Sequence, residues 1–146
     1  MGNDKSRKFA KLIIEKCYIT LDDILDEKGD SIKIDGQRRL SWSQGEGTNK
    51  NYPVNEQLNI VKGEPRVCDL ASTDFKFDRI AFSTWSGFSN HIPIGMYTIY
   101  ITVFGEWQKH QLNEPYSLIL NYEGRNNLLI SDIKKRKKGK DNQSKE

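Results

Sequence analysis

The sequence predicts an all-β domain in which short antiparallel strands build a sandwich or a barrel. Three observations lead to this prediction. Short runs alternate apolar and polar residues, turn residues rich in glycine, asparagine and proline separate these runs, and no long amphipathic helical pattern occurs. The 146 residues suffice for one domain with its own core, and the 10% aromatic content argues against a disordered chain.

The predicted strands of the N-terminal half are short. Residues 16–25 alternate apolar and polar side chains, with Cys17, Ile19 and Leu21 on one face. Residues 26–30 then carry the turn sequence Asp-Glu-Lys-Gly-Asp. Further strands are predicted at 38–43, 58–60 and 66–70, with a glycine-rich loop at 44–53.

The C-terminal half holds the clearest strand. Along residues 96–104 the side chains alternate between two faces, and Tyr97 and Ile99 share one of these faces. Gly105 ends the run. We expect this strand to supply part of the core. Other strands are predicted at 80–83, 116–122 and 126–133, with a turn at 92–95 and a polar connection at 105–114.

These segments resemble the pattern of a known domain. The pattern comprises a Cys-bearing strand at 17–21, Leu-Ser-Trp-Ser at 40–43, Arg-Val-Cys-Asp-Leu at 66–70, a strand after Ile-Pro-Ile-Gly at 92–99, Val-Phe-Gly-Glu at 103–106 and Asn-Tyr-Glu-Gly at 121–124. It resembles a poorly characterised prokaryotic Ig-like β-sandwich domain over about residues 10–125. The resemblance implies an Ig-like antiparallel β-sandwich of about seven strands and brings no catalytic residues with it.

Such domains usually begin with a strand before the Cys-bearing one. In this chain only the first residues remain for that strand, so the resemblance implies an unpaired sheet edge, through which two copies could pair into a homodimer. We expect a flexible N-terminus at 1–8, a β-sandwich domain at 9–133 and a disordered basic tail at 134–146.

The positive charge of the chain is concentrated at its C-terminus. Residues 134–146 contain seven basic and two acidic residues, whereas the remaining residues contain 16 basic and 18 acidic ones. A basic nucleic-acid-binding face on the folded domain is therefore not expected.

The basic tail itself has three interpretations. It could bind nucleic-acid phosphates in a salt-sensitive way, bind an anionic membrane surface, or remain a solvated end. In the first two cases the contacts would come from Lys134, Lys135, Arg136, Lys137, Lys138 and Lys140. The N-terminal sequence Met-Gly-Asn-Asp-Lys-Ser also fits an N-myristoylation pattern, and lipidation of Gly2 stays open.

The sequence contains no recognisable catalytic motif, and we expect a protein that is not an enzyme and uses no cofactor or metal. His91 precedes a turn and His110 lies among polar residues, so a hydrolase built on either is the least favoured hypothesis. Cys17 and Cys68 are expected as buried thiols, although one disulfide stays open, and their spacing from the histidines is unlike that of zinc sites. The acidic run at 22–30 lacks the closing glutamate of an EF-hand, so a solvated turn is expected.

The hypothesis that follows is a non-enzymatic interaction or accessory module that binds another protein. The expected contact surface comprises the loops 44–55, 84–92 and 105–114 and an exposed edge strand. Trp42 and Trp85 are expected in the core or at a sheet corner. Trp107 is the best candidate for an exposed aromatic, although a tryptophan in a loop usually folds back onto the domain. The candidate contact residues are Trp107, Trp85, Phe88 and Tyr52. Neither a transmembrane run nor a secretory signal is visible, so a cytoplasmic location is expected.

Overall fold

The computed structural model describes residues 13–36, 38–42, 58–61, 68–74, 78–84, 87–125 and 127–137. These residues form strands, turns and extended segments without a helix, which confirms the all-β prediction. The strands are β1 (Ile13–Leu25), β2 (Ser41–Trp42), β3 (Leu58–Val61), β4 (Cys68–Asp69), β5 (Ala71–Asp74), β6 (Arg79–Thr84), β7 (Gly87–Pro93), β8 (Gly95–Trp107), β9 (His110–Tyr122) and β10 (Leu128–Lys135). The predicted flexible N-terminus at 1–8 and the predicted loop at 44–53 lie outside the described residues.

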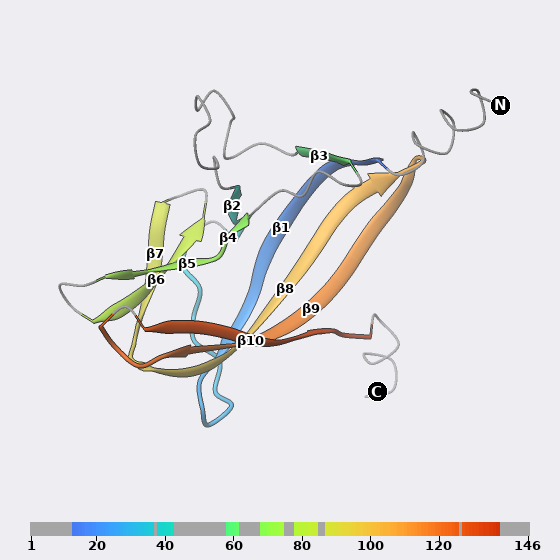
Figure 1. The fold of residues 1–146 in the computed structure, drawn as a ribbon. Coiled ribbons are helices and arrows are strands. Elements are labelled where there is room, and N and C mark those ends of the chain that lie inside the picture. The colour runs from blue at the N-terminus through green and yellow to red at the C-terminus, as the bar shows by residue number, and fades with distance from the viewer. Residues whose placement is uncertain are drawn as a thin grey trace.

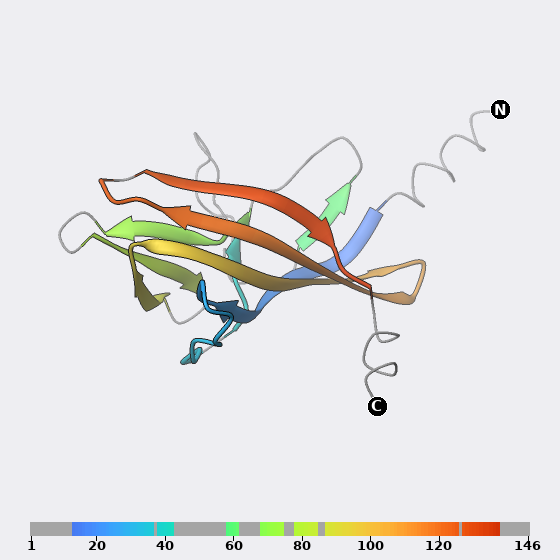
Figure 2. The same ribbon diagram turned by 90° about the horizontal axis from the view of Figure 1, so that it is seen from below.

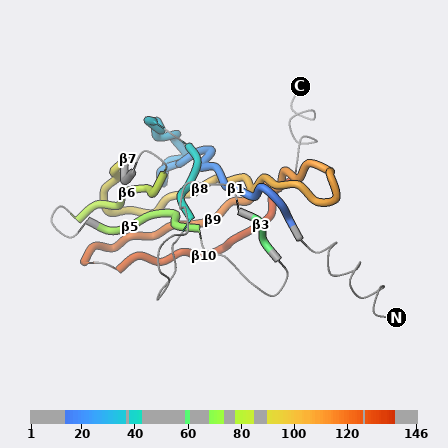
Figure 3. The backbone as a smooth tube through the Cα atoms, turned by 90° about the horizontal axis from the view of Figure 1, so that it is seen from above, coloured from blue at the N-terminus to red at the C-terminus, as the bar shows by residue number. Residues whose placement is uncertain are grey.

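The described strands form three antiparallel sheets. The largest has five strands in the order β10-β9-β8-β1-β3, and it curls along its length (Figure 1). A three-stranded sheet, β5-β6-β7, lies at one end of the molecule, away from the end that holds β3 (Figure 3), and β2 pairs with β4. Among the described strands, β10 and β3 are the edges of the large sheet. The Cys-bearing strand β1 therefore lies inside its sheet, and the expectation of an unpaired edge at this strand is wrong.

The hairpin made by β8 and β9 is the longest feature of the fold. Its ladder ends with Trp107 opposite His110 and leaves only Gln108 and Lys109 for the turn. Their φ angles of 51° and 67° are those of a two-residue type I′ turn. The prediction of a polar connection at 105–114 is therefore wrong. Polar residues occupy this part of both strands because the tip of the hairpin is exposed to solvent.

Strand β1 pairs with β8 along most of its length, but a β-bulge at Asp22 interrupts the ladder. The register between the two strands shifts between Leu21 and Asp23, so Asp22 is an extra residue. The extra residue turns Leu21 and Ile24 toward the same face, although they are three positions apart, and both are fully buried. The bulge thereby adds a second large side chain of β1 to the core.

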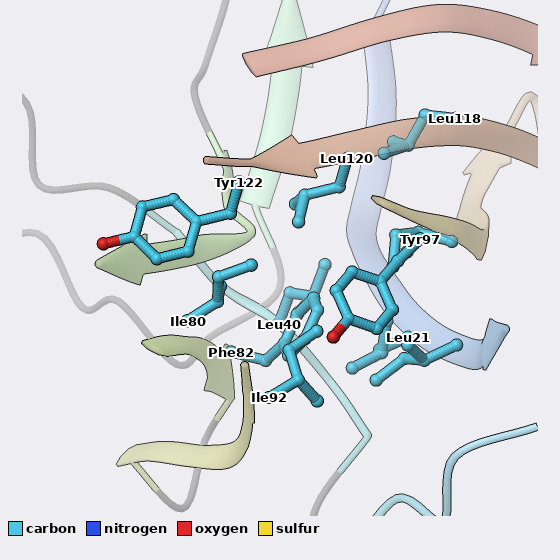
Figure 4. Close-up of a cluster of buried hydrophobic side chains, with 11 residues drawn as sticks. Leu21, Leu40, Ile80, Phe82, Ile92, Tyr97, Leu118, Leu120 and Tyr122 are labelled. Carbon is cyan, nitrogen blue, oxygen red and sulfur yellow. The ribbon is translucent and has the colours of Figure 1, made fainter. Parts of the chain in front are cut away.

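The hydrophobic core lies between the five-stranded and the three-stranded sheets (Figure 4). Its largest fully buried side chains are Tyr122, Phe82, Leu21, Ile24, Ile80, Ile99 and Leu120. The hydroxyl of Tyr122 donates a hydrogen bond to Oδ1 of Asp78 at 3.2 Å, so burial of the ring does not leave this hydroxyl unpaired. The prediction that the strand at 96–104 supplies part of the core is confirmed by the buried Tyr97 and Ile99, and Trp42 is buried as expected.

Gly105 lies where β8 comes closest to β1. A methyl group at this position would be 2.7 Å from Cγ2 of Ile14 and 3.4 Å from the carbonyl oxygen of Glu15. The space between the strands thus requires glycine. The prediction that Gly105 ends its strand is wrong, because β8 continues to Trp107.

The described part of the chain contains ten strands, where the resemblance implies about seven. Strand β7 accounts for one of the differences, since it occupies most of the predicted loop at 84–92. Its sequence, Gly-Phe-Ser-Asn-His-Ile-Pro, shows no apolar alternation. Pairing with β6 holds it extended, with a register shift between Ile80 and Phe82 and a φ of 54° at Asn90.

Candidate interaction site on strand β10

Strand β10 is an edge of the five-stranded sheet. Among the described strands only β9 pairs with it, from Leu128 opposite Tyr122 to Lys135 opposite Tyr116. Figure 2 shows it as the outermost of the three long strands β10, β9 and β8. Seven of its eight residues are exposed. The side of β10 that faces away from β9 is therefore accessible to a further strand.

Three large apolar side chains of β10 are exposed. The exposed fraction is 60% for Leu129, 44% for Ile130 and 64% for Ile133, whereas Leu128 packs partly against the core. Single exposed apolar side chains are ordinary on protein surfaces. Three exposed apolar side chains on one edge strand are typical of an edge with which a strand of another chain can pair.

Sequence reasoning predicted a last short strand here but did not single out its apolar residues. The run Leu-Leu-Ile-Ser-Asp-Ile carries apolar side chains at four of six positions without alternation. Such a run indicates a strand with apolar residues on both faces. The sequence did not show that this strand would have a neighbouring strand on one side only.

The hydrogen bonds of the β9–β10 turn show which backbone groups of β10 point outward. The carbonyl of Asn127 accepts a hydrogen bond from the amide of Glu123 at 3.1 Å, so this carbonyl faces β9. Backbone groups alternate in direction along an antiparallel strand. Leu128 and Ile130 therefore direct their N–H and C=O groups away from β9.

A β-bulge divides β10 into two parts. The register with β9 shifts between Ser131 and Lys134, and Asp132 has a φ of 49°. A bulge bends an edge strand and shortens the stretch along which another strand can pair regularly. Most residues before the bulge are apolar, and the residues after it are Ile133 and then the basic Lys134 and Lys135.

Arg136 holds the end of β10 against the sheet. Its amide donates a hydrogen bond to the carbonyl of Pro115 at 2.8 Å, and its Nε donates one to the carbonyl of Tyr116 at 3.3 Å. The guanidinium lies over the ring of Tyr100, 4.6 Å from the centroid, and Nη2 lies 3.7 Å from Oδ2 of Asp22. We refer to these four contacts as the Arg136 clasp.

Neighbouring hydroxyl groups orient the carboxylate of the Arg136 clasp. The hydroxyl of Thr20 donates to Oδ1 of Asp22 at 2.7 Å, and the hydroxyl of Thr102 donates to Oδ2. Arg38 Nη1 donates to the backbone carbonyl of Asp22 at 3.1 Å. The side chains of Arg136 and Asp22 are each about one-third exposed, so water weakens the ion pair itself. The hydrogen bonds around Asp22 thus mainly determine where the clasp closes.

The first residues of the predicted basic tail belong to the folded domain. Lys134 and Lys135 lie in β10, so the prediction that a disordered tail begins at 134 is wrong. Nζ of Lys135 lies 2.7 Å from Oε1 of Glu114, and this hydrogen bond and the charge of Glu114 raise the pKa of Lys135. The sequence alone does not predict this arrangement. Lysines at the end of a strand that lacks apolar alternation give the same sequence pattern as lysines of a solvated tail.

The remaining tail residues differ in their surroundings. Lys134 and Lys137 are exposed, and no ion pair joins either of them to another described residue. Lys138 and Lys140 lie outside the described residues. Of the predicted phosphate or lipid contacts that the structure describes, Lys135 and Arg136 are thus already engaged with Glu114 and Asp22.

The predicted aromatic contacts do not lie on β10. Trp107 is 38% exposed at the hairpin tip, and its role in binding stays a prediction. The backbone of Phe88 lies in β7 opposite Ser83, and its side chain is outside the described part. Trp85 and Tyr52 are also outside the described residues. Trp107 and Phe88 belong to different sheets.

The histidines and the cysteines differ in their exposure. His91 and His110 are exposed, Cys17 is buried and Cys68 is half-buried, and both thiols are free. Burial raises the pKa of Cys17, and burial together with the nearby Asp69 and Cys17 raises the pKa of Cys68 to about 12. Both thiols are therefore protonated and unreactive at neutral pH. Among the described residues, no three metal-binding side chains of the His, Cys, Asp or Glu type gather at one place.

The hollows on the surface of the described part include two that are lined by residues of β1 or β8. One, of about 220 Å³, is lined by the turn 26–28 and by residues 94–97. The other, of about 150 Å³, lies beside Tyr18 and Gly105. Both are smaller than pockets that hold small-molecule ligands, which measure roughly 300–1,000 Å³. The free edge of β10 is therefore the stronger candidate for a functional site.

A membrane-spanning helix does not occur among the described residues. Comparisons with protein-family models, with curated proteins and with solved structures each find no match to this chain. The resemblance to an Ig-like β-sandwich domain therefore stays a prediction drawn from the sequence pattern.

Proposed function

We propose that this chain is a non-enzymatic interaction module that binds another protein by accepting a strand of the partner at the free edge of β10. The observation that carries the proposal is the exposure of Leu129, Ile130 and Ile133 on a strand that pairs only with β9 among the described strands. A partner strand would bond to the outward backbone groups and cover these apolar side chains. Without a partner, such an edge favours aggregation.

The support of β10 by the rest of the sheet favours the proposal. The strand pairs with β9, its first residue Leu128 packs partly against the core, and the Arg136 clasp holds its far end. A binding strand that is already held in an extended conformation loses little conformational entropy when the partner binds.

We also propose that the two packed sheets form an Ig-like β-sandwich and that the protein acts in the cytoplasm. The core shared by the five-stranded and three-stranded sheets supports the first statement. The free thiols of Cys17 and Cys68 support the second, because disulfides are rare in reducing compartments.

Binding of nucleic acid or of an anionic membrane is the second candidate function. The exposed Lys134 and Lys137 favour it, together with the lysines that follow in the sequence. The pairing of Lys135 with Glu114 argues against it, because it uses part of the basic charge inside the domain.

Selection of a displayed library of random peptides on the full chain tests the proposed function. We expect the selection to enrich peptides that bind in an extended conformation. Ile130→Pro should weaken their binding by at least about tenfold. The proline removes an N–H group that points away from β9, so it blocks the added strand and leaves the existing ladder intact. Ile130→Val is the matched control, because it keeps both the N–H group and an apolar side chain.

A second measurement keeps the test decisive if Ile130→Pro does not fold. In the wild-type chain, hydrogen exchange at the amide of Ile130 should slow when a selected peptide is bound. An unchanged exchange rate would contradict the proposal, as would a selection that enriches no peptide.

A further inference from the structure

We infer that the partner segment is an extended peptide that runs antiparallel to β10, with acidic residues in its N-terminal half and apolar residues in its C-terminal half. This inference rests on the proposed function and adds the chemistry and the direction of the partner. It follows from the order of side chains along β10, where the apolar run Leu128 to Ile130 precedes the bulge at Asp132 and basic residues begin at Lys134, after Ile133.

The part of β10 before the bulge selects apolar residues. Leu128 and Ile130 direct backbone groups outward, so a partner strand can bond to both. Leu129 and Ile130 point to opposite faces of the sheet, since they are consecutive in the strand and lie opposite Asn121 and Leu120. Apolar partner residues beside this part of β10 would therefore meet exposed apolar side chains on either face.

The part of β10 after the bulge selects acidic residues. Lys134 and Lys137 are exposed and form no ion pair with another described residue. Lys135 is bound to Glu114 and Arg136 to Asp22, so these two mainly fix the strand. Carboxylates of a partner strand would lie within reach of the unpaired lysines, and cross-strand pairs of opposite charge stabilise a sheet.

The direction of the partner follows from the sheet. Every pair of strands in the described part is antiparallel, and antiparallel ladders are slightly more stable per residue than parallel ones. An antiparallel partner has its N-terminal half beside Lys134 and Lys137. Its acidic residues therefore precede its apolar residues.

A second copy of the chain fits this edge less well. Antiparallel pairing of two β10 strands about a centre between Ser131 and Asp132 would set Leu129 opposite Lys134, without an acidic partner for the lysine. Parallel pairing in register would set lysine opposite lysine, and like charges directly opposite each other destabilise a sheet. A partner with complementary charge avoids both problems.

Three synthetic peptides with blocked ends and the length of β10 test the inference against the full chain. The first carries glutamates followed by alternating valine and threonine, the second carries the same residues in reverse order, and the third has lysine in place of glutamate. We expect the first to bind at least about tenfold more tightly than the third, as measured by fluorescence anisotropy. Added salt should reduce this difference, because the charges are exposed.

A charge reversal on the protein provides the complementary test. The double substitution Lys134→Glu and Lys137→Glu should weaken binding of the acidic peptide by at least about tenfold and strengthen binding of the lysine peptide. Lys28→Glu combined with Lys33→Glu is the matched control. It changes the net charge equally at two exposed residues outside the large sheet, and we expect it to change the affinity by less than about twofold.

The outcomes separate this inference from the proposed function. Equal binding of the acidic and lysine peptides, both weakened by Ile130→Pro, would overturn the charge preference while strand addition stands. Tighter binding of the reversed peptide would overturn the antiparallel direction.

Self-association that Ile130→Pro abolishes would identify a second copy as the occupant. Binding of single-stranded RNA, lost on the double reversal while the acidic peptide does not bind, would identify nucleic acid. Each of these results contradicts the inference.

Discussion

The two faces of the five-stranded sheet stabilise this molecule in different ways. On the core face, Leu118, Leu120 and Tyr122 of β9 are buried against the three-stranded sheet. On the opposite face, Asp22 and Arg136 form the polar contacts of the clasp, and each remains about one-third exposed. Burial of a large apolar side chain contributes about 1.5–3 kcal/mol, whereas an exposed ion pair contributes about 0–1 kcal/mol. The core face thus determines whether the sheet forms, and the outer face determines how its edge strand ends.

The largest effect is expected from shortening a side chain of the core face. Leu120→Ala removes part of a side chain with 0% exposure and should lower the free energy of unfolding by about 2–5 kcal/mol, because a cavity remains. Ile119→Ala, on the opposite face of the same strand, is the control and should cost less. Denaturant unfolding of both variants measures the difference. Equal losses would show that the two faces do not differ in this way.

A smaller effect is expected where β8 and β1 touch directly. Gly105→Ala places a methyl group 2.7 Å from Cγ2 of Ile14 and should lower the free energy of unfolding by about 1–3 kcal/mol. Ile14→Ala removes that contact, so the alanine at 105 should cost less when both substitutions are present. Denaturant unfolding of the two single variants and the double variant gives the coupling energy. A coupling near zero would mean that the strands separate without cost.

The smallest effect is expected from opening the Arg136 clasp on the outer face. Arg136→Ala removes the contacts with Tyr100 and Asp22 and should lower the free energy of unfolding by about 1 kcal/mol. Hydrogen exchange at the amide of residue 136 should become faster, because the end of β10 is released. Lys134→Ala is the matched control and should leave this exchange unchanged. A loss as large as that of Leu120→Ala would place the clasp among the main stabilising contacts of the fold.

Sequence periodicity predicted the parts of the fold in which buried and exposed residues alternate along a strand. The core positions Tyr97 and Ile99 follow from simple alternation in β8. The burial of Ile24 does not follow from alternation. The bulge at Asp22 shifts by one residue the alternation that Cys17, Ile19 and Leu21 follow. A bulge depends on the partner strand, and one sequence contains no direct signal for it. The same limit applies to Asp132 in β10.

The candidate site was predicted only in outline. The sequence led us to expect an exposed edge strand, and the structure has such a strand at β10, whereas the resemblance implied an unpaired edge at the N-terminal strand. Which strand ends a sheet depends on pairings between distant segments, such as β1 with β8. The role of Arg136 was equally hidden, because its partners Asp22 and Tyr100 approach it only in the folded sheet.

The pairing of β1 with β8 imposes an order on folding during synthesis. The hydrogen bond from Thr102 to Asp22 joins residues 80 positions apart, whereas β8 and β9 are joined by a turn of two residues, Gln108 and Lys109. The hairpin can form soon after it leaves the ribosome, but β1 leaves long before β8 exists. Until then the apolar residues Leu21 and Ile24 have no core to enter. The first of the described strands therefore waits for one of the last, and during this delay its apolar residues remain exposed to aggregation.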